Sequence, residues 1–240
     1  MAKPINRTAS TLVLALVAVC SGCQWTATGH NLHGVRLHNA GQYSSAIQEF
    51  QKAIAKRPND TDGLYNMAAT LHRMGAEPKN AAKLEQAEAL YHQCLDLEPN
   101  HVECHRGLAV LLVETGRSDK AFTFLHNWVR ANPNISDGHI ELARLYEEFG
   151  DKEAAEQSLH NALGVNENSY RAWTALGSIR EQNGQIALAI QNYQRSVQHN
   201  NFQPQVAQRI ATLSRDMQSQ TSATNNRTRM VNIPTTIQQR

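Results

Sequence analysis

Histidine and cysteine are the residue types in this chain with the most obvious chemistry, because both ligate metals. The densest group is His101, Cys104 and His105, in the segment HVECH. His101 and His105 are four residues apart and would share one face of a helix. The segment does not match HExxH, because Glu103 is misplaced for that zinc motif, and it does not match the haem-attachment motif CxxCH. We therefore predict no metal site and no cofactor.

No other combination of residues indicates catalysis. The chain has no glycine-rich phosphate loop after a predicted strand, and no Ser–His–Asp or paired-carboxylate arrangement. Its formal net charge is +2, far from the basic excess of a nucleic-acid-binding protein. Four cysteines are too few to form the disulfide scaffold of a 240-residue chain. We predict a protein that is not an enzyme and binds neither nucleic acid nor a small-molecule substrate.

One set of residue types recurs along the chain at a spacing of about 34 residues, which is typical of helix–turn–helix repeats. Each unit has a glycine that would end its first helix, then a small and a large residue one turn apart on its second helix. The glycines are Gly41, Gly75, Gly116, Gly150 and Gly184. The small and large residues are Ala46 and Phe50, Ala87 and Tyr91, Ala121 and Leu125, Ala155 and Leu159, and Ala189 and Tyr193. Pro58, Pro99 and Pro133 close the first three units, because proline cannot continue a helix.

These positions resemble those of the tetratricopeptide repeat family. Trp173 and Tyr146 match the family's Trp and Tyr, and Leu176/Gly177 matches its Leu–Gly pair. The resemblance covers residues 27–203 and implies an all-α fold, a right-handed α-solenoid of five helix–turn–helix units. The predicted units are 27–60, 61–101, 102–135, 136–169 and 170–203.

The chain beyond the repeats divides into two parts. Residues 204–218 are predicted to form a capping helix, with Val206, Ile210 and Leu213 as its apolar stripe. Residues 219–240 are rich in Ser, Thr, Asn and Gln and are predicted to be a disordered tail. Unit two is longer by seven residues around 77–83. We expect the insertion to lengthen the second helix behind an N-cap at Asn80, with a local loop excursion as the alternative.

The N-terminus has the pattern of a targeting segment. Lys3 and Arg7 precede an apolar run of signal-peptide length, and that run is too short to span a bilayer comfortably. The run ends in CSGC, which resembles a bacterial lipobox, except that Cys20 stands where Leu is usual. The resemblance implies that 1–23 is a lipoprotein signal peptide and that Cys23 is lipidated. Ordinary cleavage near Cys20 is the alternative. We expect a lipid anchor to place the protein in the cell envelope, at the outer membrane or on the periplasmic side.

The family resemblance also implies a concave groove, lined by the first helices, that binds a protein or peptide partner. Asn66 matches the family's peptide-backbone-binding Asn. The implied groove residues are Asn31, His38, Tyr65, Asn66, His72, Arg73, Arg106, Asp137, Glu141, Arg144, Glu147, Glu148 and Arg171.

The groove residues predict a charge gradient. Units one and two are neutral or basic, whereas units four and five carry most of the acids. Helical spacing lets Glu141 pair with Arg144, and we expect the remaining negative charge to attract basic residues of a partner. We expect Glu141→Arg with Glu148→Arg to weaken partner capture and to be tolerated by the fold. The layout of a lipid anchor and a few repeats is similar to that of pilus-assembly lipoproteins (Flp or type IV type) and cell-wall scaffolds. The alternatives are a subunit or non-catalytic remnant of a repeat-containing glycosyltransferase, and a structural envelope spacer.

Two further cysteines stand at positions where successive units face each other. Cys94 lies on a predicted second helix and Cys104 on the next first helix, and the equivalent residues elsewhere are mostly small. An exported protein meets an oxidising environment, so these cysteines either form a disulfide or remain two buried thiols. At another unit junction, Trp128 is expected to lie over Gly138.

Overall fold

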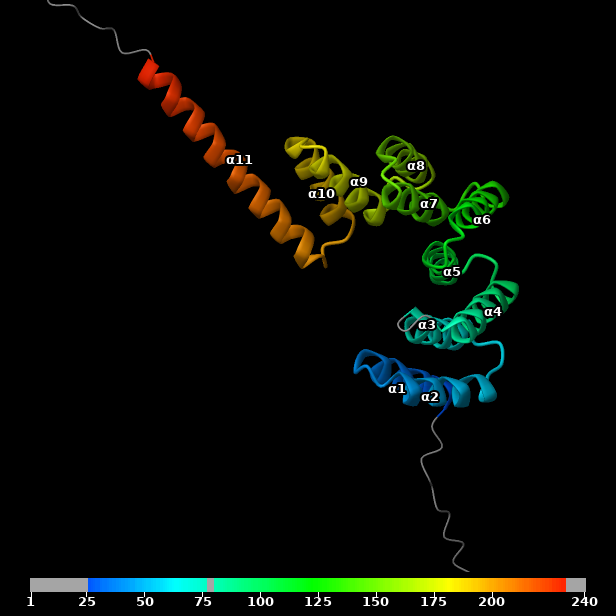
Figure 1. Ribbon diagram of the computed structural model, residues 1–240. Coiled ribbons are helices and arrows are strands. Elements are labelled where there is room, and N and C mark those ends of the chain that lie inside the picture. The colour runs from blue at the N-terminus through cyan, green and yellow to red at the C-terminus, as the bar shows by residue number, and fades with distance from the viewer. Residues whose placement is uncertain (1–25, 77–79, 232–240) are drawn as a thin grey trace, which may run out of the picture.

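The computed structural model describes residues 26–76 and 80–231, and these residues contain helices and no strand. The helices follow one another as pairs joined by short turns, and Figure 1 shows the pairs stacked in an arc. The helices are α1 (Ala27–Asn39), α2 (Tyr43–Lys56), α3 (Thr61–Ala76), α4 (Ala81–Leu97), α5 (Val102–Glu114), α6 (Ser118–Ala131), α7 (Ser136–Glu148), α8 (Lys152–Val165), α9 (Tyr170–Gln182), α10 (Ile186–His199) and α11 (Pro204–Val231). The predicted α-solenoid is confirmed.

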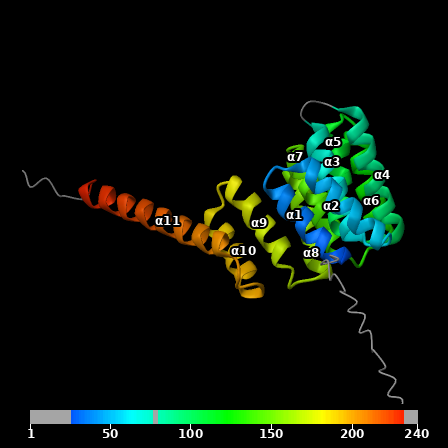
Figure 2. The ribbon, with the colours of Figure 1, turned by 90° about the horizontal axis from the view of Figure 1, so that it is seen from below.

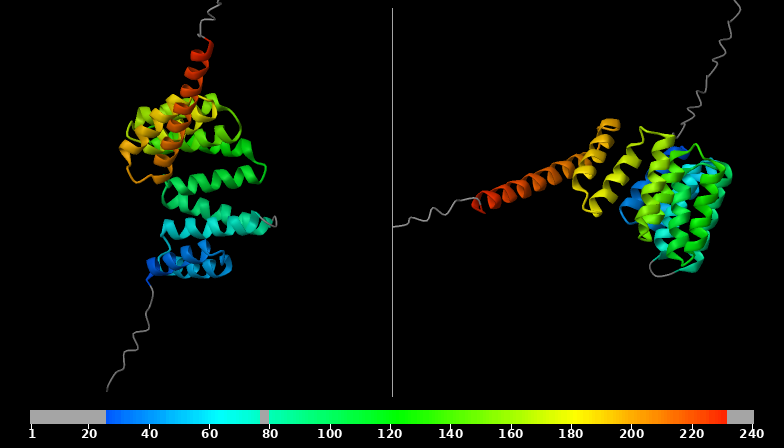
Figure 3. Two further views of the ribbon diagram at one scale, coloured as in Figure 1. Left: turned by 90° about the vertical axis from the view of Figure 1, so that its left-hand side faces the viewer. Right: turned by 90° about the horizontal axis from the view of Figure 1, so that it is seen from above.

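The first helix of each pair lies on the inner side of the arc. In Figure 1, α3, α5 and α7 line the concave side, and α4, α6 and α8 form the convex side. Each first helix contacts the first helix of the next unit, from α1 to α9. Figure 3 shows the same stacking from two other directions. The side chains of α5, α7 and α9 are thereby presented together on one surface.

The helix ends follow from the repeated glycines and caps. Gly41, Gly116, Gly150 and Gly184 have φ between 73° and 79°, a left-handed conformation that glycine adopts at little cost. Gly75 differs from this prediction, because it lies inside α3, which continues to Ala76. A Cβ at Gly75 would lie 2.9 Å from the side chain of Leu84, so this glycine allows α4 to approach α3 closely.

Small residues opposite aromatic rings set the distance between the two helices of a pair. A Cβ added to Gly34 would lie 2.5 Å from the ring of Phe50, and one added to Gly177 would lie 2.6 Å from the ring of Tyr193. Between the pairs, where α6 of one unit meets α7 of the next, the expected contact of Trp128 with Gly138 is confirmed, since a Cβ at Gly138 would be 3.5 Å from the indole. Glycine at Gly34 and Gly177 is therefore a packing requirement of the fold.

The insertion in unit two lengthens both helices of the pair, and not only the second as predicted. Helix α3 has 16 residues where the other first helices of the repeats have 13, and α4 has 17 where the other second helices have 14. The N-cap predicted at Asn80 is present, because the side chain of Asn80 accepts a hydrogen bond from the amide of Lys83. Adding residues to both helices keeps the pair in register, so the neighbouring units still stack.

The last helix covers the end of the stack and then projects from it. Ile210 and Leu213 of α11 pack with Ile190 and Tyr193 of α10, so α11 shields the apolar face of the last unit. The helix continues to Val231, beyond the end predicted at 218 and into the predicted disordered tail, and Figure 2 shows it extending away from the repeats. The sequence has no glycine after Gly184 and no proline between 204 and 234, so nothing in it interrupts α11.

The predicted signal peptide and the proposed lipidation site at Cys23 lie outside the described residues. Among the helices that are described, none has the length and apolar character needed to cross a bilayer.

Candidate functional site

A hollow of about 580 Å³ lies on the surface formed by the first helices of units three, four and five. We call it the α5–α7–α9 groove. Its apolar lining, which we call the floor, includes Ala109, Val110 and Val113 from α5 and Ile140 and Leu145 from α7. Six of the predicted groove residues line it: Arg106, Glu141, Arg144, Glu147, Glu148 and Arg171.

Glu141 is the centre of an ion-pair cluster in this groove. Only 3% of Glu141 is exposed, and both of its carboxylate oxygens accept hydrogen bonds from Arg106, at 2.9 and 2.5 Å. Arg171 donates a further hydrogen bond to Glu141 at 2.5 Å and also pairs with Asp137. The Nε atom of Arg144 is 3.8 Å from the carboxylate. The cluster therefore joins α5, α7 and α9, one helix from each of three units.

The charge of Glu141 is maintained by these arginines. Burial raises the pKa of the carboxyl, but the hydrogen bonds and positive charges of Arg106, followed by the charges of Arg171 and Arg144, outweigh it. The net result is that the pKa of Glu141 lies below its ordinary value. The pKa of Arg106 is raised, chiefly by its hydrogen bonds to Glu141. Both groups are therefore charged at neutral pH.

This geometry changes two of the expectations about Glu141. The sequence predicted an exposed acidic side chain, paired at most with Arg144, and predicted that Glu141→Arg with Glu148→Arg would leave the fold intact. The side chain is instead buried and already paired, so an arginine there would face Arg106 and Arg171 without a counterion. Glu148 and Arg144 are exposed and remain available to a partner.

The predicted groove residues of units one and two form hydrogen bonds with their neighbours. The amide of Asn66 donates to the side chain of Asn31 at 3.0 Å. His38 is bonded to Thr70 at 2.9 Å, and His72 to Glu114 at 2.9 Å. Tyr65 packs against Tyr91 and His101, and the charge of Arg73 contributes to lowering the pKa of His38 after burial. These residues do not line the α5–α7–α9 groove.

Four polar residues that line the groove were missed by the sequence analysis. Tyr170, Thr174 and Ser178 lie one turn apart on α9, and Gln203 comes from the turn before α11. The three α9 residues could have been found by extending the face of Arg171 along its own helix. Gln203 could not, because its place depends on how the chain turns between α10 and α11.

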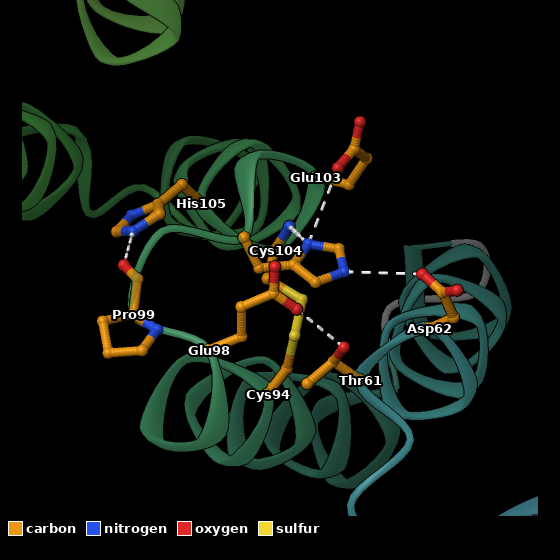
Figure 4. Close-up of a disulfide and its surroundings, with 9 residues drawn as sticks. Thr61, Asp62, Cys94, Glu98, Pro99, Glu103, Cys104 and His105 are labelled. Carbon is orange, nitrogen blue, oxygen red and sulfur yellow. Dashed lines mark hydrogen bonds and ion pairs between the residues drawn. A yellow bond between two sulfur atoms is a disulfide. The ribbon is translucent and has the colours of Figure 1, made fainter. Parts of the chain in front are cut away.

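Cys94 and Cys104 are joined by a disulfide, with their Cα atoms 6.7 Å apart. The bond links α4 to α5 and so ties unit two to unit three, as Figure 4 shows. Of the two histidines considered with Cys104, His105 is turned away from the sulfur atoms and is bonded to the carbonyl of Pro99 at 2.9 Å. His101 faces the disulfide region, within 4.8 Å of both sulfur atoms.

Comparisons of the sequence with known proteins identify the repeats. Profiles described as "TPR repeat" and "Tetratricopeptide repeat" match residues 34–75, 81–139 and 140–204. A curated relative, Protein O-mannosyl-transferase tmtc2 of Xenopus laevis, is 32% identical over 96 residues. Those residues are 39% of this chain and only 11% of the relative, so the chain spans about a tenth of that protein.

A solved structure shows the same fold. TTC0263, a thermophilic TPR protein of Thermus thermophilus, superimposes with a TM-score of 0.59 at 21% identity, over 78% of this chain and 98% of that one. YrrB, described as a TPR protein with an unusual peptide-binding site, has a TM-score of 0.43 at 12% identity, over 76% and 90% of the two chains. The profile matches and the stacked helix pairs agree, and the chain belongs to the tetratricopeptide repeat family.

Proposed function

We propose that this protein is a non-catalytic adaptor that binds a segment of a partner protein in the α5–α7–α9 groove. The observation that carries the proposal is that the groove is lined both by apolar side chains and by charged groups of both signs. Apolar side chains of a peptide would be buried on the floor, and the charged groups would fix its position and direction. A groove that extends over three units also matches an extended chain or a helix better than a small metabolite.

The charges available to the partner are fewer than the sequence indicates. Asp137 and Glu141 are paired with Arg171, and Glu141 also with Arg106. Arg144 and Glu148 are exposed, and Glu147 is bonded to Gln182. We therefore expect apolar contacts to supply most of the affinity, and the opposed charges of Arg144 and Glu148 to orient the partner.

Blocking the floor tests this proposal more directly than changing a charge. Val110 lines the groove and is 37% exposed, so Val110→Arg would place a long cation over the floor, one helical turn from Arg106. We expect capture of the partner from crosslinked membranes to fall at least about tenfold, or ~1.4 kcal/mol. Quantitative mass spectrometry of the captured proteins measures the change.

A matched control is available on the convex side. Val165, at the end of α8, is 38% exposed and does not line the groove. Val165→Arg should capture the partner as the wild type does, with both variants retaining the helical circular dichroism of the native chain. Equal capture by the Val110→Arg variant would place the partner elsewhere. Recovery of no stoichiometric partner would favour the structural spacer.

We also propose that the adaptor is anchored to the envelope by a lipid on Cys23 and acts in assembly of a pilus, secretion or cell-wall complex. The support for the anchor is the CSGC sequence after an apolar run. Cys23→Ser is expected to move the protein to the soluble fraction or to block its processing, as membrane fractionation and the mass of the mature chain would show. As a control, the Cys20→Ser variant, changed three residues earlier, should remain attached to the membrane. Unchanged attachment and mature mass of the Cys23→Ser variant would contradict lipidation.

A glycosyltransferase subunit is the second candidate, because the relative of 32% identity is named as an O-mannosyl-transferase. The shared segment is 11% of that relative, so a partner subunit would have to supply the rest of such an enzyme. We expect the purified chain to transfer no sugar to acceptor proteins. Transfer above the level of a heat-denatured control would support the enzyme class.

A further inference from the structure

The junction of units two and three carries three potential metal ligands on two helices and the turn between them. Cys94 is on α4, Cys104 is in the first turn of α5, and His101 is the N-cap of α5. One ring nitrogen of His101 and the two sulfur atoms all lie within 4.8 Å of one another. Both cysteines are fully buried and His101 is 7% exposed, so the group is shielded from water.

The repeat itself does not require these residue types. The equivalent pairs at other unit junctions include Ala53 with Gly63 and Ala162 with Ala172, so small size is sufficient there. At the N-cap position, Ser169 caps α9 with an ordinary hydroxyl oxygen. His101 caps α5 with its Nδ1 atom, which accepts a hydrogen bond from the amide of Cys104. At equivalent positions elsewhere in this chain, small residues and a hydroxyl N-cap take the places of the two cysteines and the histidine.

Carboxylates complete the surroundings of His101. Asp62 Oδ1 is 3.7 Å from Nε2, and Glu103 Oε2 is 3.6 Å from Nδ1. The hydroxyl of Thr61 donates to Glu98 at 2.8 Å, which holds the start of α3, and with it Asp62, against the turn between α4 and α5. Figure 4 shows Asp62 and Glu103 on the side of the disulfide opposite to His105.

We propose that this junction is a zinc site in the reduced protein, with Cys94, Cys104 and His101 as ligands and Asp62 as the fourth. Two thiolates, one imidazole and one carboxylate are a ligand set that zinc accepts in tetrahedral geometry. The thiolates also favour zinc over magnesium or calcium, which prefer oxygen ligands. Because Nδ1 is engaged by the helix cap, Nε2 is the nitrogen that meets the metal, and it is the one beside Asp62.

The change from disulfide to metal site balances when a dithiol supplies the electrons. The dithiol transfers two electrons and two protons to the S–S bond, which yields two thiols, and the reductant itself becomes a disulfide. Zn²⁺ then displaces both thiol protons into water and binds the two thiolates. In the buried junction the charge of the ion compensates that of the thiolates, which would otherwise be costly to bury.

Formation of the site requires side-chain movement: Asp62 is not among the residues whose ligand atoms lie within 4.8 Å of one another, and its side chain is 77% exposed, so it must turn toward the sulfur atoms. With bonds of about 2.3 Å to sulfur and about 2.1 Å to nitrogen and oxygen, ligand atoms around a tetrahedral ion are roughly 3.4–3.8 Å apart. The 3.7 Å between Asp62 and His101 Nε2 already falls in that range. Once the S–S bond is broken, rotation of the cysteine side chains lets the two sulfur atoms move apart while the helices stay in place.

Cobalt titration of the reduced full-length chain tests the site. The protein is reduced with dithiothreitol, freed of it without oxygen, and titrated with Co²⁺, which reports thiolate ligands by charge-transfer absorption and tetrahedral geometry by its visible bands. We expect one Co²⁺ per chain, displaced by one Zn²⁺, and no such absorption from the oxidised protein. His101→Asn should weaken binding at least about 100-fold, since losing even a residue that supports a ligand costs 10–100-fold. Asparagine is a good N-cap, so this variant keeps the start of α5.

Two controls separate this site from other cysteines and histidines. Cys94→Ala with Cys104→Ala copies the small residues of other junctions and keeps Cys20 and Cys23, so it should fold and lose the cobalt signal. His92→Gln, at an exposed position of α4, should bind as the wild type does. A reduced protein without the cobalt spectrum, or a spectrum kept by the double alanine or His101→Asn variant, would overturn the proposal.

Discussion

Glu141→Gln is expected to lower the free energy of unfolding by about 3 kcal/mol. The substitution keeps the size of the side chain and removes the charge that Arg106 and Arg171 share. Removing one member of a buried ion pair typically costs about 3–5 kcal/mol, because the partner charge is left uncompensated. The lower end applies here, since the side chains of the two arginines are 30% and 28% exposed and retain some hydration. Urea unfolding followed by circular dichroism measures the difference.

Glu148→Gln is the matched control for this prediction. Glu148 is on the same helix and lines the same groove, but it is exposed. Its replacement should change the free energy of unfolding by less than about 0.5 kcal/mol, as is usual for surface positions. If Glu141→Gln changed stability no more than Glu148→Gln does, the cluster would not be a structural link between α5, α7 and α9.

Much of the helical framework could be predicted from the sequence, because each repeated residue type has a conformational or packing role that depends on its close neighbours in the chain. A glycine with positive φ ends the first helix at Gly41, Gly116, Gly150 and Gly184. Gly75 was misassigned because the insertion extends α3 past it, and the same glycine then serves a close approach to Leu84. The type of residue was informative, but its role depended on the helix length.

The ion-pair cluster was not predicted, because its strongest contacts join residues of neighbouring units. Local helical spacing would pair Glu141 with Arg144, three residues away, and that contact is 3.8 Å. The short contact is with Arg106, 35 residues earlier. Asn31 and Asn66 are bonded across the same separation of 35. The fifth residue of one unit (Asn31, Arg106) thus contacts the sixth residue of the next unit (Asn66, Glu141). Helical spacing within one helix cannot predict such a contact, but the repeat period of about 34 residues can.

His105 marks another limit of reading a residue from its type. The sequence offered it as a possible metal ligand beside Cys104, whereas the structure stacks its ring on the indole of Trp128, with centroids 3.7 Å apart. The Nε2 atom donates to the carbonyl of Pro99, and the buried Nδ1 atom has no hydrogen-bond partner among the described residues. A proton on Nδ1 would have no acceptor, so the ring packs against Trp128 as a neutral imidazole.

The stability of the protein is therefore expected to fall between pH 6.5 and 4 through protonation of His105. Burial, reinforced by the charge of His101, lowers the pKa of His105 to about 4, against the opposing effects of the Pro99 hydrogen bond and the Glu141 charge. In the unfolded chain the pKa is about 6.5, so the unfolded state binds the proton first and gains stability as the pH falls. The contribution of neutral His105 to the free energy of unfolding is fully present above pH 6.5. That free energy is lower by about 2 kcal/mol at pH 5 and by about 3 kcal/mol near pH 4.

Comparing two variants with the wild type isolates this effect. His105→Phe keeps an aromatic ring beside Trp128 but cannot titrate, so its free energy of unfolding should fall by about 2 kcal/mol less than that of the wild type between pH 7 and pH 5. His92→Gln removes an exposed histidine and should keep the wild-type pH dependence. Burial also lowers the pKa of His38 and His139, so some pH dependence should persist in the His105→Phe variant. Parallel curves for the wild type and the His105→Phe variant, measured by urea unfolding at each pH, would show that His105 accepts a proton in the folded protein as readily as in the unfolded chain.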